Sequence, residues 1–410
     1  MQGWLASLWG HLWNWGANQA NHRSRPKRRT RLHFEQLEDR TVPATFLVRD
    51  IVVGTGTSGP QEVTEVNGTV YFEAYHPSFG HELWRSDGTS SGTVLVRDIR
   101  PGSAGSAPSW LTNVNGTLFF LAHDGSTGWE LWRSNGTSTG TVLVRDIRPG
   151  TDSSYPYLLT NVSGTLFFRA NDGSTGAELW RSNGTSTGTG LVRDICPGTG
   201  GSDPSELTNV NGTLFFQAND GSTGAELWRS NGTSTGTGLV RDIRPGMDGS
   251  GPSRLTNVNG TVFFRANDGS TGRELWRSNG TSAGTVLVRD ICPGTGGSYP
   301  YWPTNVNGTL FFSANDGSTG WELWRSNGTS TGTGLVRDIR PGTGGSYPYL
   351  LTNVNGTLFF SADDGSTGSE LWRSNGTSTG TVLVRDLRPG MDGSGPSRLT
   401  NVNGTLFFSA

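Results

Sequence analysis

The chain has 410 residues, of which 32% are hydrophobic and 62 are glycine, a composition often found in disordered chains. Its 15 Trp and 18 Phe nevertheless recur at fixed spacing, and disordered segments lack aromatic residues, so we expect a folded chain. The net charge is −2, divided into +4 over residues 1–44 and −6 over the rest. The larger part therefore lacks the basic excess of a nucleic-acid-binding protein.

Residues 1–44 are unlike the rest of the chain. Tryptophan and leucine side chains fall at helical spacing between Trp4 and Trp13. The stretch is shorter than the roughly 20 apolar residues of a transmembrane helix, so we expect no membrane span. Two interpretations stay open. One is a helix lying in a membrane interface, and the other is a start codon assigned upstream of the true one.

A basic run from Arg23 to Arg31 leads into a short motif that ends this segment. Its fixed positions are Leu37, Glu38, Arg40, Pro43 and Ala44. The motif resembles bacterial N-terminal export or sorting segments with an arginine-rich lead and a core of the form Leu-Glu-x-Arg-x-x-Pro-Ala. The resemblance implies a bacterial protein that is secreted or displayed at the cell surface. We therefore expect a targeting or disordered segment over residues 1–44 and a folded repeat domain over residues 45–410.

A 48-residue unit repeats through the second part of the chain. The tripeptide Glu-Leu-Trp occurs seven times at this spacing, starting at Glu82, Glu130, Glu178, Glu226, Glu274, Glu322 and Glu370. Repeats with periods of about 20–50 residues are typical of solenoids, propellers and repeat arrays. The period therefore decides the fold class before any single element is assigned.

Each unit predicts four short strands and no helix. In the unit over residues 204–243, the expected strands are 206–210, 213–218, 226–230 and 238–243. The dipeptide Asn211-Gly212 is a two-residue turn of the kind that closes hairpins. A polar glycine loop, a second turn and a proline-glycine linker separate the other strands.

The central strands of a unit are apolar on both faces. Leu214 and Phe216 point to one side of the sheet and Phe215 to the other. Such a sheet must be covered on both sides, and identical sheets stacked around an axis cover one another. We therefore predict an all-β fold, a β-propeller of four-stranded antiparallel blades.

The blade count stays open between seven and eight. Residues 48–51 match the fourth strand of a unit, seven full units follow, and residues 399–410 supply only the first two strands of another. Three interpretations fit: a chain truncated at Ala410, an incomplete eighth blade, or seven blades with an extra hairpin. We expect eight positions around the axis.

Charged side chains also recur inside the strands. Arg229 and Arg241 lie near Glu226 and Asp242 in the sequence, and we predict ion pairs within or between blades. The alternative is that these side chains lie at exposed strand ends and contribute little to stability.

The unit resembles the bacterial ELWxxDGT repeat. The residues that carry the resemblance read ELWRSDGTSSGTVLVRDIRPG from Glu82 and ELWRSNGTSTGT in later units. Most copies have Asn in place of the motif's Asp, for example Asn135 and Asn231, and both residues suit a turn with positive φ. The resemblance covers residues 45–410 and implies surface proteins with propeller-like repeats and no defined activity.

Differences among the repeats point to one face of the predicted propeller. The loop between the second and third strands and the linker after the fourth share a face, and the variable positions map there. Many variants are aromatic: Trp110, Trp129, Tyr155, Tyr157, Tyr299, Tyr301, Trp302, Trp321, Tyr347 and Tyr349. Others are charged: His81, Arg169, Glu206, Arg254, Arg265, Arg273 and Arg398. Aromatic side chains and arginine are enriched at binding hot spots, so we predict that this face binds a glycan or a protein. Neutral drift after duplication is the alternative.

No catalytic constellation is evident, and we expect no enzyme. All six His lie at or before His123, so later units have no imidazole base. The loop Asp220-Gly221 departs from the Asp-x-Gly loops of sialidase propellers.

We also expect no cofactor or metal, with calcium at the loop around Asn219, Asp220 and Ser222 and at Glu226 as the alternative. One such loop has only two carboxylates, whereas calcium takes 6–8 oxygen ligands. Cys196 and Cys292 lie two units apart, beyond the ~7 Å reach of a disulfide, so we expect both to be free.

These features together predict a monomeric, non-catalytic, extracellular or cell-surface β-propeller that acts as a binding or adhesion module. The first alternative is a purely structural surface or matrix repeat protein. The second, less favoured alternative is a propeller hydrolase.

Overall fold

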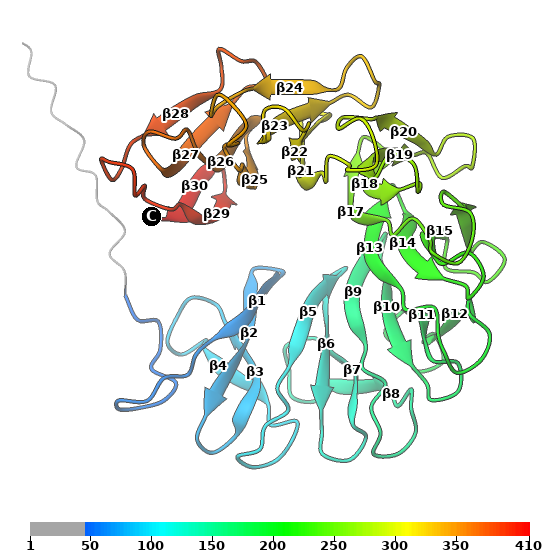
Figure 1. Ribbon diagram of the computed structural model, residues 1–410. Helices are drawn as coiled ribbons and strands as arrows, with labels where there is room; N and C mark the ends of the chain where they lie inside the picture. Colours follow the sequence, from blue (N-terminus) through cyan, green and yellow to red (C-terminus); the bar gives the residue numbers. More distant parts are fainter. Residues whose placement is uncertain (1–45) are drawn as a thin grey trace, which may run out of the picture. The chain divides into compact units, whose positions relative to one another are not determined.

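Seven four-stranded antiparallel sheets and one two-stranded sheet make up the fold. A computed structural model describes residues 46–410, in which every regular element is a β-strand, and the compact unit spans Val48–Ala410. Figure 1 shows the sheets following one another around a central axis as the blades of a β-propeller. The predicted fold class is confirmed. The predictions for residues 1–44 lie outside the described residues.

The strands recur in the same order in every blade. Blade 1 contains β1 (Gln61–Val66), β2 (Thr69–His76), β3 (Gly80–Ser86) and β4 (Val94–Arg97), and blade 2 contains β5 (Ser109–Val114), β6 (Thr117–His123), β7 (Trp129–Ser134) and β8 (Val142–Arg145). Blade 3 contains β9 (Tyr157–Val162), β10 (Thr165–Asn171), β11 (Ala177–Ser182) and β12 (Gly190–Arg193), and blade 4 contains β13 (Ser205–Val210), β14 (Thr213–Asn219), β15 (Ala225–Ser230) and β16 (Gly238–Arg241). Blade 5 contains β17 (Ser253–Val258), β18 (Thr261–Asn267), β19 (Arg273–Ser278) and β20 (Val286–Arg289), and blade 6 contains β21 (Tyr301–Val306), β22 (Thr309–Asn315), β23 (Trp321–Ser326) and β24 (Gly334–Arg337). Blade 7 contains β25 (Tyr349–Val354), β26 (Thr357–Asp363), β27 (Ser369–Ser374) and β28 (Val382–Arg385), and a half-blade contains β29 (Ser397–Val402) and β30 (Thr405–Ser409).

The predicted strands agree with those of blade 4 to within two residues at either end. Residues 48–51, which we expected to match a fourth strand, form no strand. Instead, Ile51 and Val52 pack against Phe72, Ala74 and Trp84 of blade 1. The structure has seven full blades and a two-stranded hairpin at the eighth position, which agrees with each of the three interpretations of the blade count.

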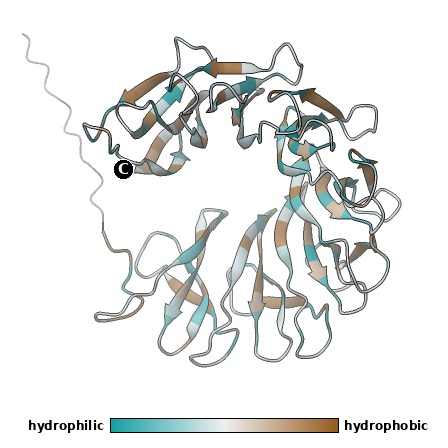
Figure 2. Ribbon diagram, viewed as in Figure 1, coloured by the Kyte–Doolittle hydropathy of each residue, from teal (hydrophilic) through white to brown (hydrophobic). Residues whose placement is uncertain are grey.

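The hydrophobic core is divided into layers between neighbouring blades, as the two-sided strands predicted. In the layer between blades 3 and 4, Phe167, Leu179, Val192 and Ile195 of blade 3 meet Leu214, Phe216, Ala218 and Trp228 of blade 4. The same repeat positions form the layers that follow. Figure 2 shows hydrophobic segments on the strands of every blade and paler or hydrophilic connecting loops.

Polar contacts cross the same interfaces. On the inner side, Nδ2 of Asn305 donates to the carbonyl of Asn257 in the preceding blade at 3.2 Å. Its Oδ1 accepts from the N–H of Gly308 in its own turn at 2.9 Å. On the outer side, Nη1 of Arg241 donates to the carbonyl of Thr285 in the next blade at 2.6 Å. Both contacts recur from blade to blade, so each interface is fixed at two edges.

The predicted arginine–acid pairs are wrong. Among the described residues, no salt bridge joins Arg229 or Arg241 to an acid, and the salt bridges that do form lie on loops and strand ends. Arg241 instead binds a carbonyl of the next blade. Glu226 is fully buried and faces the linker, where its carboxylate accepts from the N–H of Arg244 at 3.2 Å and from the N–H and Oγ of Ser250 at 2.7 and 2.6 Å. A hydrogen-bonded carboxylate therefore holds each linker against its blade.

The two ends of the series of blades differ from its interior. Phe311 and Phe312 of blade 6 are 3% and 0% exposed, whereas their counterparts Phe407 and Phe408 in the half-blade are 57% and 37% exposed. The half-blade lacks the third and fourth strands that complete an interface elsewhere. Its apolar side chains therefore contribute less to the core than identical residues in the interior.

This difference yields a prediction from one pair of identical substitutions. Phe312→Ala should destabilise the domain by about 3–5 kcal/mol, because it opens a cavity in a closed layer. Phe408→Ala removes the same side chain from a partly exposed position and should cost less than about 1 kcal/mol. Urea unfolding of both variants measures the two values, and equal losses would contradict the layered core.

The buried glutamates predict how stability depends on pH. Burial raises the pKa of Glu130 to about 7, against the opposing hydrogen bonds from Ser154 and Ile147. The pKa values of five equivalent residues are raised for the same reason: Glu82, Glu178, Glu226, Glu274 and Glu322. Because the pKa of Glu130 is higher in the folded than in the unfolded state, where it is 4.5, protonation of this carboxyl group increases the free energy of unfolding. This contribution is fully present below pH 4.5 and is lost as the pH rises through about 7.

Aspartates in the loops make stability depend on pH in the opposite direction. Partial burial raises the pKa of Asp220, but the hydrogen bonds from Thr223 and Ser222 lower it by more than burial raises it. The pKa of Asp220 therefore lies below its ordinary value of 3.8. The contribution of ionised Asp220 to stability is present above pH 3.8 and is lost as the pH falls.

The buried glutamates predict that urea midpoints measured between pH 3 and 8 decline from pH 5 to 7, and Glu130→Gln should make the decline shallower. A rise in stability from pH 5 to 7 would refute this assignment.

Candidate functional site

A ring of β-bulges shapes the inner edge of the propeller. The first strand of each blade is innermost, since these strands contact one another in series from β1 to β29. In β21 the register shifts between Tyr301 and Thr304, and Trp302 has a φ of 54°. The equivalent residues of the other blades also have positive φ: Glu62, Trp110, Leu158, Glu206, Arg254, Leu350 and Arg398. Bulges re-aim side chains, so each blade presents one side chain in a conformation that regular strands do not allow.

The linkers lie beside the loops between the second and third strands, as predicted. The N–H groups of Ser346 and Tyr347 donate to the carbonyl of Trp321 at 2.8 and 3.0 Å. The N–H of Asp363 donates in turn to the carbonyl of Ser346 at 2.9 Å. These backbone contacts bring variable residues from the linker, the bulge and the loop to one edge of the propeller.

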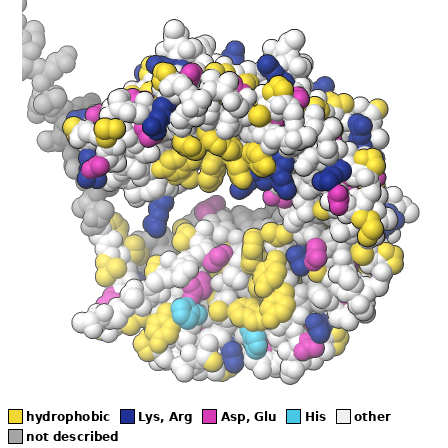
Figure 3. Space-filling model, in the orientation of Figure 1, with side chains coloured by type: hydrophobic (Ala, Val, Ile, Leu, Met, Phe, Trp, Pro, Cys, Tyr) yellow, Lys and Arg dark blue, Asp and Glu magenta, His cyan; other side chains and the backbone are white. Residues whose placement is uncertain are grey.

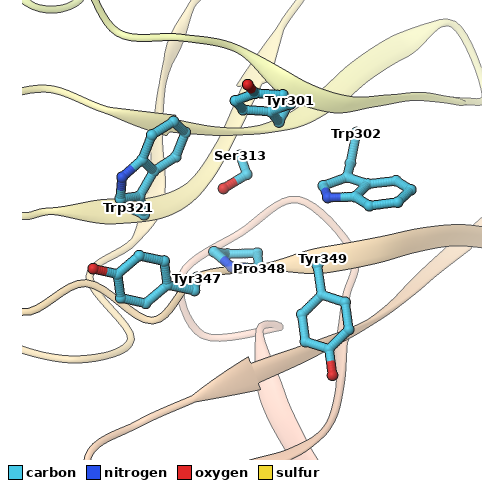
Figure 4. A pocket seen from close by; sticks show the side chains of 7 residues that line it. All are labelled: Tyr301, Trp302, Ser313, Trp321, Tyr347, Pro348 and Tyr349. Carbon is cyan, nitrogen blue, oxygen red and sulfur yellow. The ribbon is translucent and has the colours of Figure 1, made fainter. Parts of the chain in front are cut away.

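Between blades 6 and 7 these residues line a pocket of about 250 Å³, here named the aromatic pocket. Its lining residues are Tyr301, Trp302, Ser313, Trp321, Tyr347, Pro348 and Tyr349. Figure 4 shows Tyr301, Trp302 and Trp321 facing Tyr347, Pro348 and Tyr349, with Ser313 between them. The rings of Tyr301 and Trp321 lie 5.7 Å apart between centroids, and Trp302 is 42% exposed.

The other predicted aromatic residues form a second group, here named the blade 2–3 cluster. It consists of Trp110, Trp129, Tyr155 and Tyr157, of which the rings of Trp110, Tyr155 and Tyr157 pack on one another while that of Trp129 packs on His123. Tyr155 stacks on Tyr157 at 5.8 Å, and Trp110 lies 6.2 Å from Tyr157. Nine of the ten predicted residues are therefore divided between two places, and the tenth, Tyr299, belongs to neither group.

The two groups occupy equivalent repeat positions and differ at two others. Tyr301 and Ser313 of the aromatic pocket correspond to Ser109 and Leu121 beside the blade 2–3 cluster. Ser313 lies opposite Tyr301 in the sheet and is 3% exposed, as is Leu121. A serine leaves room where leucine fills it. Ser313 and Pro348 were not among the predicted site residues, because attention to aromatic side chains overlooks the small residue that makes space for a ligand.

Three arginines of blade 5 lie beside the aromatic pocket. The guanidinium of Arg265 is 4.6 Å from the ring centroid of Tyr301, and that of Arg254 is 5.4 Å away. Hydrogen bonding to Arg265, its charge, and the charges of Arg254 and Arg273 lower the pKa of Tyr301. Figure 3 shows hydrophobic side chains gathered over β21 and β25 with basic side chains next to them. The edge of the pocket toward blade 5 is therefore electropositive.

The loops considered for calcium have another explanation. Oδ1 of Asp220 accepts from the N–H groups of Ser222 and Thr223 at 2.9 and 2.8 Å, which closes the turn. Glu226, the second carboxylate of that set, faces the linker. Over residues 46–410, no group of three or more His, Cys, Asp or Glu side chains is placed to hold a metal ion.

Both cysteines are free, as predicted, and burial raises the pKa of each thiol. The part of the chain that the structure describes contains no helix long and apolar enough to cross a membrane.

The fold is similar to those of several solved peptidases. A puromycin hydrolase matches 86% of this chain over 58% of its own length, with 15% identity and a TM-score of 0.40. Prolyl oligopeptidase B from Galerina marginata matches 82% over 51% of its length, with 12% identity and a TM-score of 0.44. A puromycin-hydrolysing peptidase from Mycobacterium tuberculosis matches 85% over 57%, with 9% identity and a TM-score of 0.40. This chain thus spans between half and three fifths of their length.

These similarities correct the function predicted from the sequence. The prediction of a non-catalytic extracellular binding or adhesion module for glycan or protein is contradicted, because the similar structures are propellers of hydrolases. The propeller hydrolase, ranked last among the alternatives, is the class to which they belong. At this identity the likeness concerns the fold and assigns no activity. The chain matches no family model and no curated protein.

Proposed function

We propose that the aromatic pocket binds an extended peptide segment through prolyl or aromatic side chains, so that the propeller serves as a peptide-recognition domain. The observation that carries the proposal is the lining itself, which has five aromatic side chains, one proline and one serine. Aromatic-lined grooves are a recurring means of docking proline-rich segments, whose extended conformation is already formed before binding.

The same lining disfavours a glycan. A sugar carries hydroxyl groups around its ring, and each needs a hydrogen-bond partner when it is buried. Besides the tyrosine hydroxyls and the indole N–H groups of Trp302 and Trp321, Ser313 supplies the remaining polar side chain of the lining, and the hydroxyl of Tyr349 already donates to the carbonyl of Pro396 at 3.2 Å. The rings of proline and aromatic side chains need no such hydrogen-bond partners, because apolar contact alone favours their burial.

The frame around the pocket favours a preformed site. Trp302 is held by the bulge of β21, and Tyr347 by the backbone hydrogen bond to Trp321. A site whose side chains are already in place loses less conformational entropy when the ligand binds. The proposal concerns the ligand of the aromatic pocket alone.

The test uses a labelled, uncharged peptide of sequence acetyl-Pro-Pro-Trp-Pro-Pro-amide and measures binding to residues 1–410 by fluorescence anisotropy. Ser313→Leu copies the residue that blade 2 carries at the equivalent position, so it should fill the pocket without unfolding the blade. We expect it to weaken binding by at least about tenfold, as expected for loss of a binding hot spot.

The matched controls come from the repeat itself. Trp302→Ala should also weaken binding about tenfold, whereas Trp110→Ala, at the same position four units earlier and 41% exposed, should leave it unchanged. The converse double variant, Ser109→Tyr with Leu121→Ser, should create a second binding site. If the peptide fails to bind, or if Trp110→Ala and Trp302→Ala have equal effects, the assignment is wrong.

A further inference from the structure

Arg265 differs from the equivalent arginine of blade 3 in what surrounds it. Both lie two residues after the start of the Phe-Phe pair in the second strand of their blade. Arg169 forms a salt bridge with Asp203 of the following linker, with Nη2 and Oδ1 2.7 Å apart. The position that corresponds to Asp203 is Tyr299 in the linker after blade 5, so Arg265 has no acid there.

No other acid takes that place. Among the described residues, no salt bridge involves Arg254, Arg265 or Arg273. Nε of Arg265 donates to Oγ of Ser253 at 3.2 Å, while its buried Nη1 has no hydrogen-bond partner. The carboxylate of Glu206 accepts from the backbone N–H of Arg254 at 2.9 Å and forms no salt bridge with Arg265. Blade 5 therefore presents a guanidinium that has no salt-bridge partner among the described residues.

This charge lies directly at the wall of the aromatic pocket. The guanidinium of Arg265 stands over the ring of Tyr301, a lining residue, at 4.6 Å. Arg254 approaches the same ring at 5.4 Å. These arginines also lower the pKa of Tyr301, Arg265 most strongly. A ligand that fills the pocket and extends toward blade 5 therefore meets this charge.

From this geometry we propose that Arg265, supported by Arg254, forms a carboxylate subsite beside the aromatic pocket. The inference rests on the proposed function and narrows its ligand to a peptide that carries a carboxylate next to its ring side chains. Arginine suits this role because its guanidinium is always charged and forms a strong, charge-assisted hydrogen bond with a carboxylate. The carboxylate belongs either to the C-terminus of the peptide or to an acidic side chain.

Three probes separate these sources and measure the effect of the charge. They are acetyl-Pro-Pro-Trp-Pro-Pro as the free acid, the same peptide as its amide, and an amide in which the last proline is replaced by glutamate. The wild-type protein should bind at least one carboxylate-bearing peptide about tenfold more tightly than the neutral amide, since a charge-assisted hydrogen bond contributes that much. Preference for the free acid identifies a C-terminal carboxylate, and preference for the glutamate peptide identifies a side chain.

Two variants test the role of Arg265 without altering the pocket. Arg265→Gln should abolish the preference while leaving the affinity for the neutral amide within about twofold of the wild type. Tyr299→Asp introduces an acid at the position that Asp203 occupies beside Arg169. The new carboxylate should form a salt bridge with Arg265 and also abolish the preference. The matched control, Arg169→Gln, removes an arginine that already has its acid and should leave the preference intact.

The outcomes distinguish the two proposals. If all three peptides bind the wild type equally, the carboxylate subsite is refuted and the aromatic pocket stands. If no peptide binds, the proposed function fails and the subsite fails with it. A preference that persists in Arg265→Gln, with an unchanged melting temperature, would also overturn the assignment, because the charge would then act from elsewhere.

Discussion

The structure depends on one constraint: every blade has two apolar faces, and each face must be covered by another blade. Phe215 enters the layer toward blade 5, while its neighbour Phe216 enters the layer toward blade 3, so adjacent residues of one strand serve different interfaces. Because no blade can satisfy both faces alone, stability comes from the series of contacts. Polar groups follow the same rule, since an inner asparagine and an outer arginine of each blade bond to carbonyls of a neighbour. In the half-blade, for which the structure describes two strands, Phe407 is 57% exposed.

Such a frame confines functional variation to positions that the interfaces do not use. Core positions of one layer recur in the next almost without change. The bulge residue, the linker and the end of the second strand are free of this requirement, and there the repeats differ most. A bulge with positive φ at each inner strand turns one side chain away from the regular alternation. The repeat thus supplies eight equivalent positions, and their chemistry ranges from glutamate through leucine to arginine and tryptophan.

The amino-acid sequence predicted the fold well because its signals were periodic and local. Strand limits, turns, blade order and the shared face of linker and loop all follow from the spacing of apolar residues, glycine and proline. The partners of buried charges did not follow, because Glu226 and Arg241 are close in sequence yet face different partners: the linker backbone and the next blade. The site was predicted only in part. Ser313 was missed, because its contrast with Leu121 at the equivalent position has meaning only once the sheet register places Ser313 opposite Tyr301.

The position of the aromatic pocket links ligand binding to the contact between blades 6 and 7. The second wall of the pocket belongs to blade 7. The face of blade 7 that points away from blade 6 lies against the two strands of the half-blade. On that face Val384 and Leu387 are 44% and 43% exposed, whereas the equivalent Val336 and Ile339 of blade 6 are 6% and 4% exposed. The hydroxyl of Tyr349 donates to the carbonyl of Pro396, which precedes β29, so a pocket residue also ties the half-blade to blade 7. A ligand that holds Tyr347 and Tyr349 against Trp302 and Trp321 would join blade 7 to blade 6 more firmly. It would thereby stabilise the folded state.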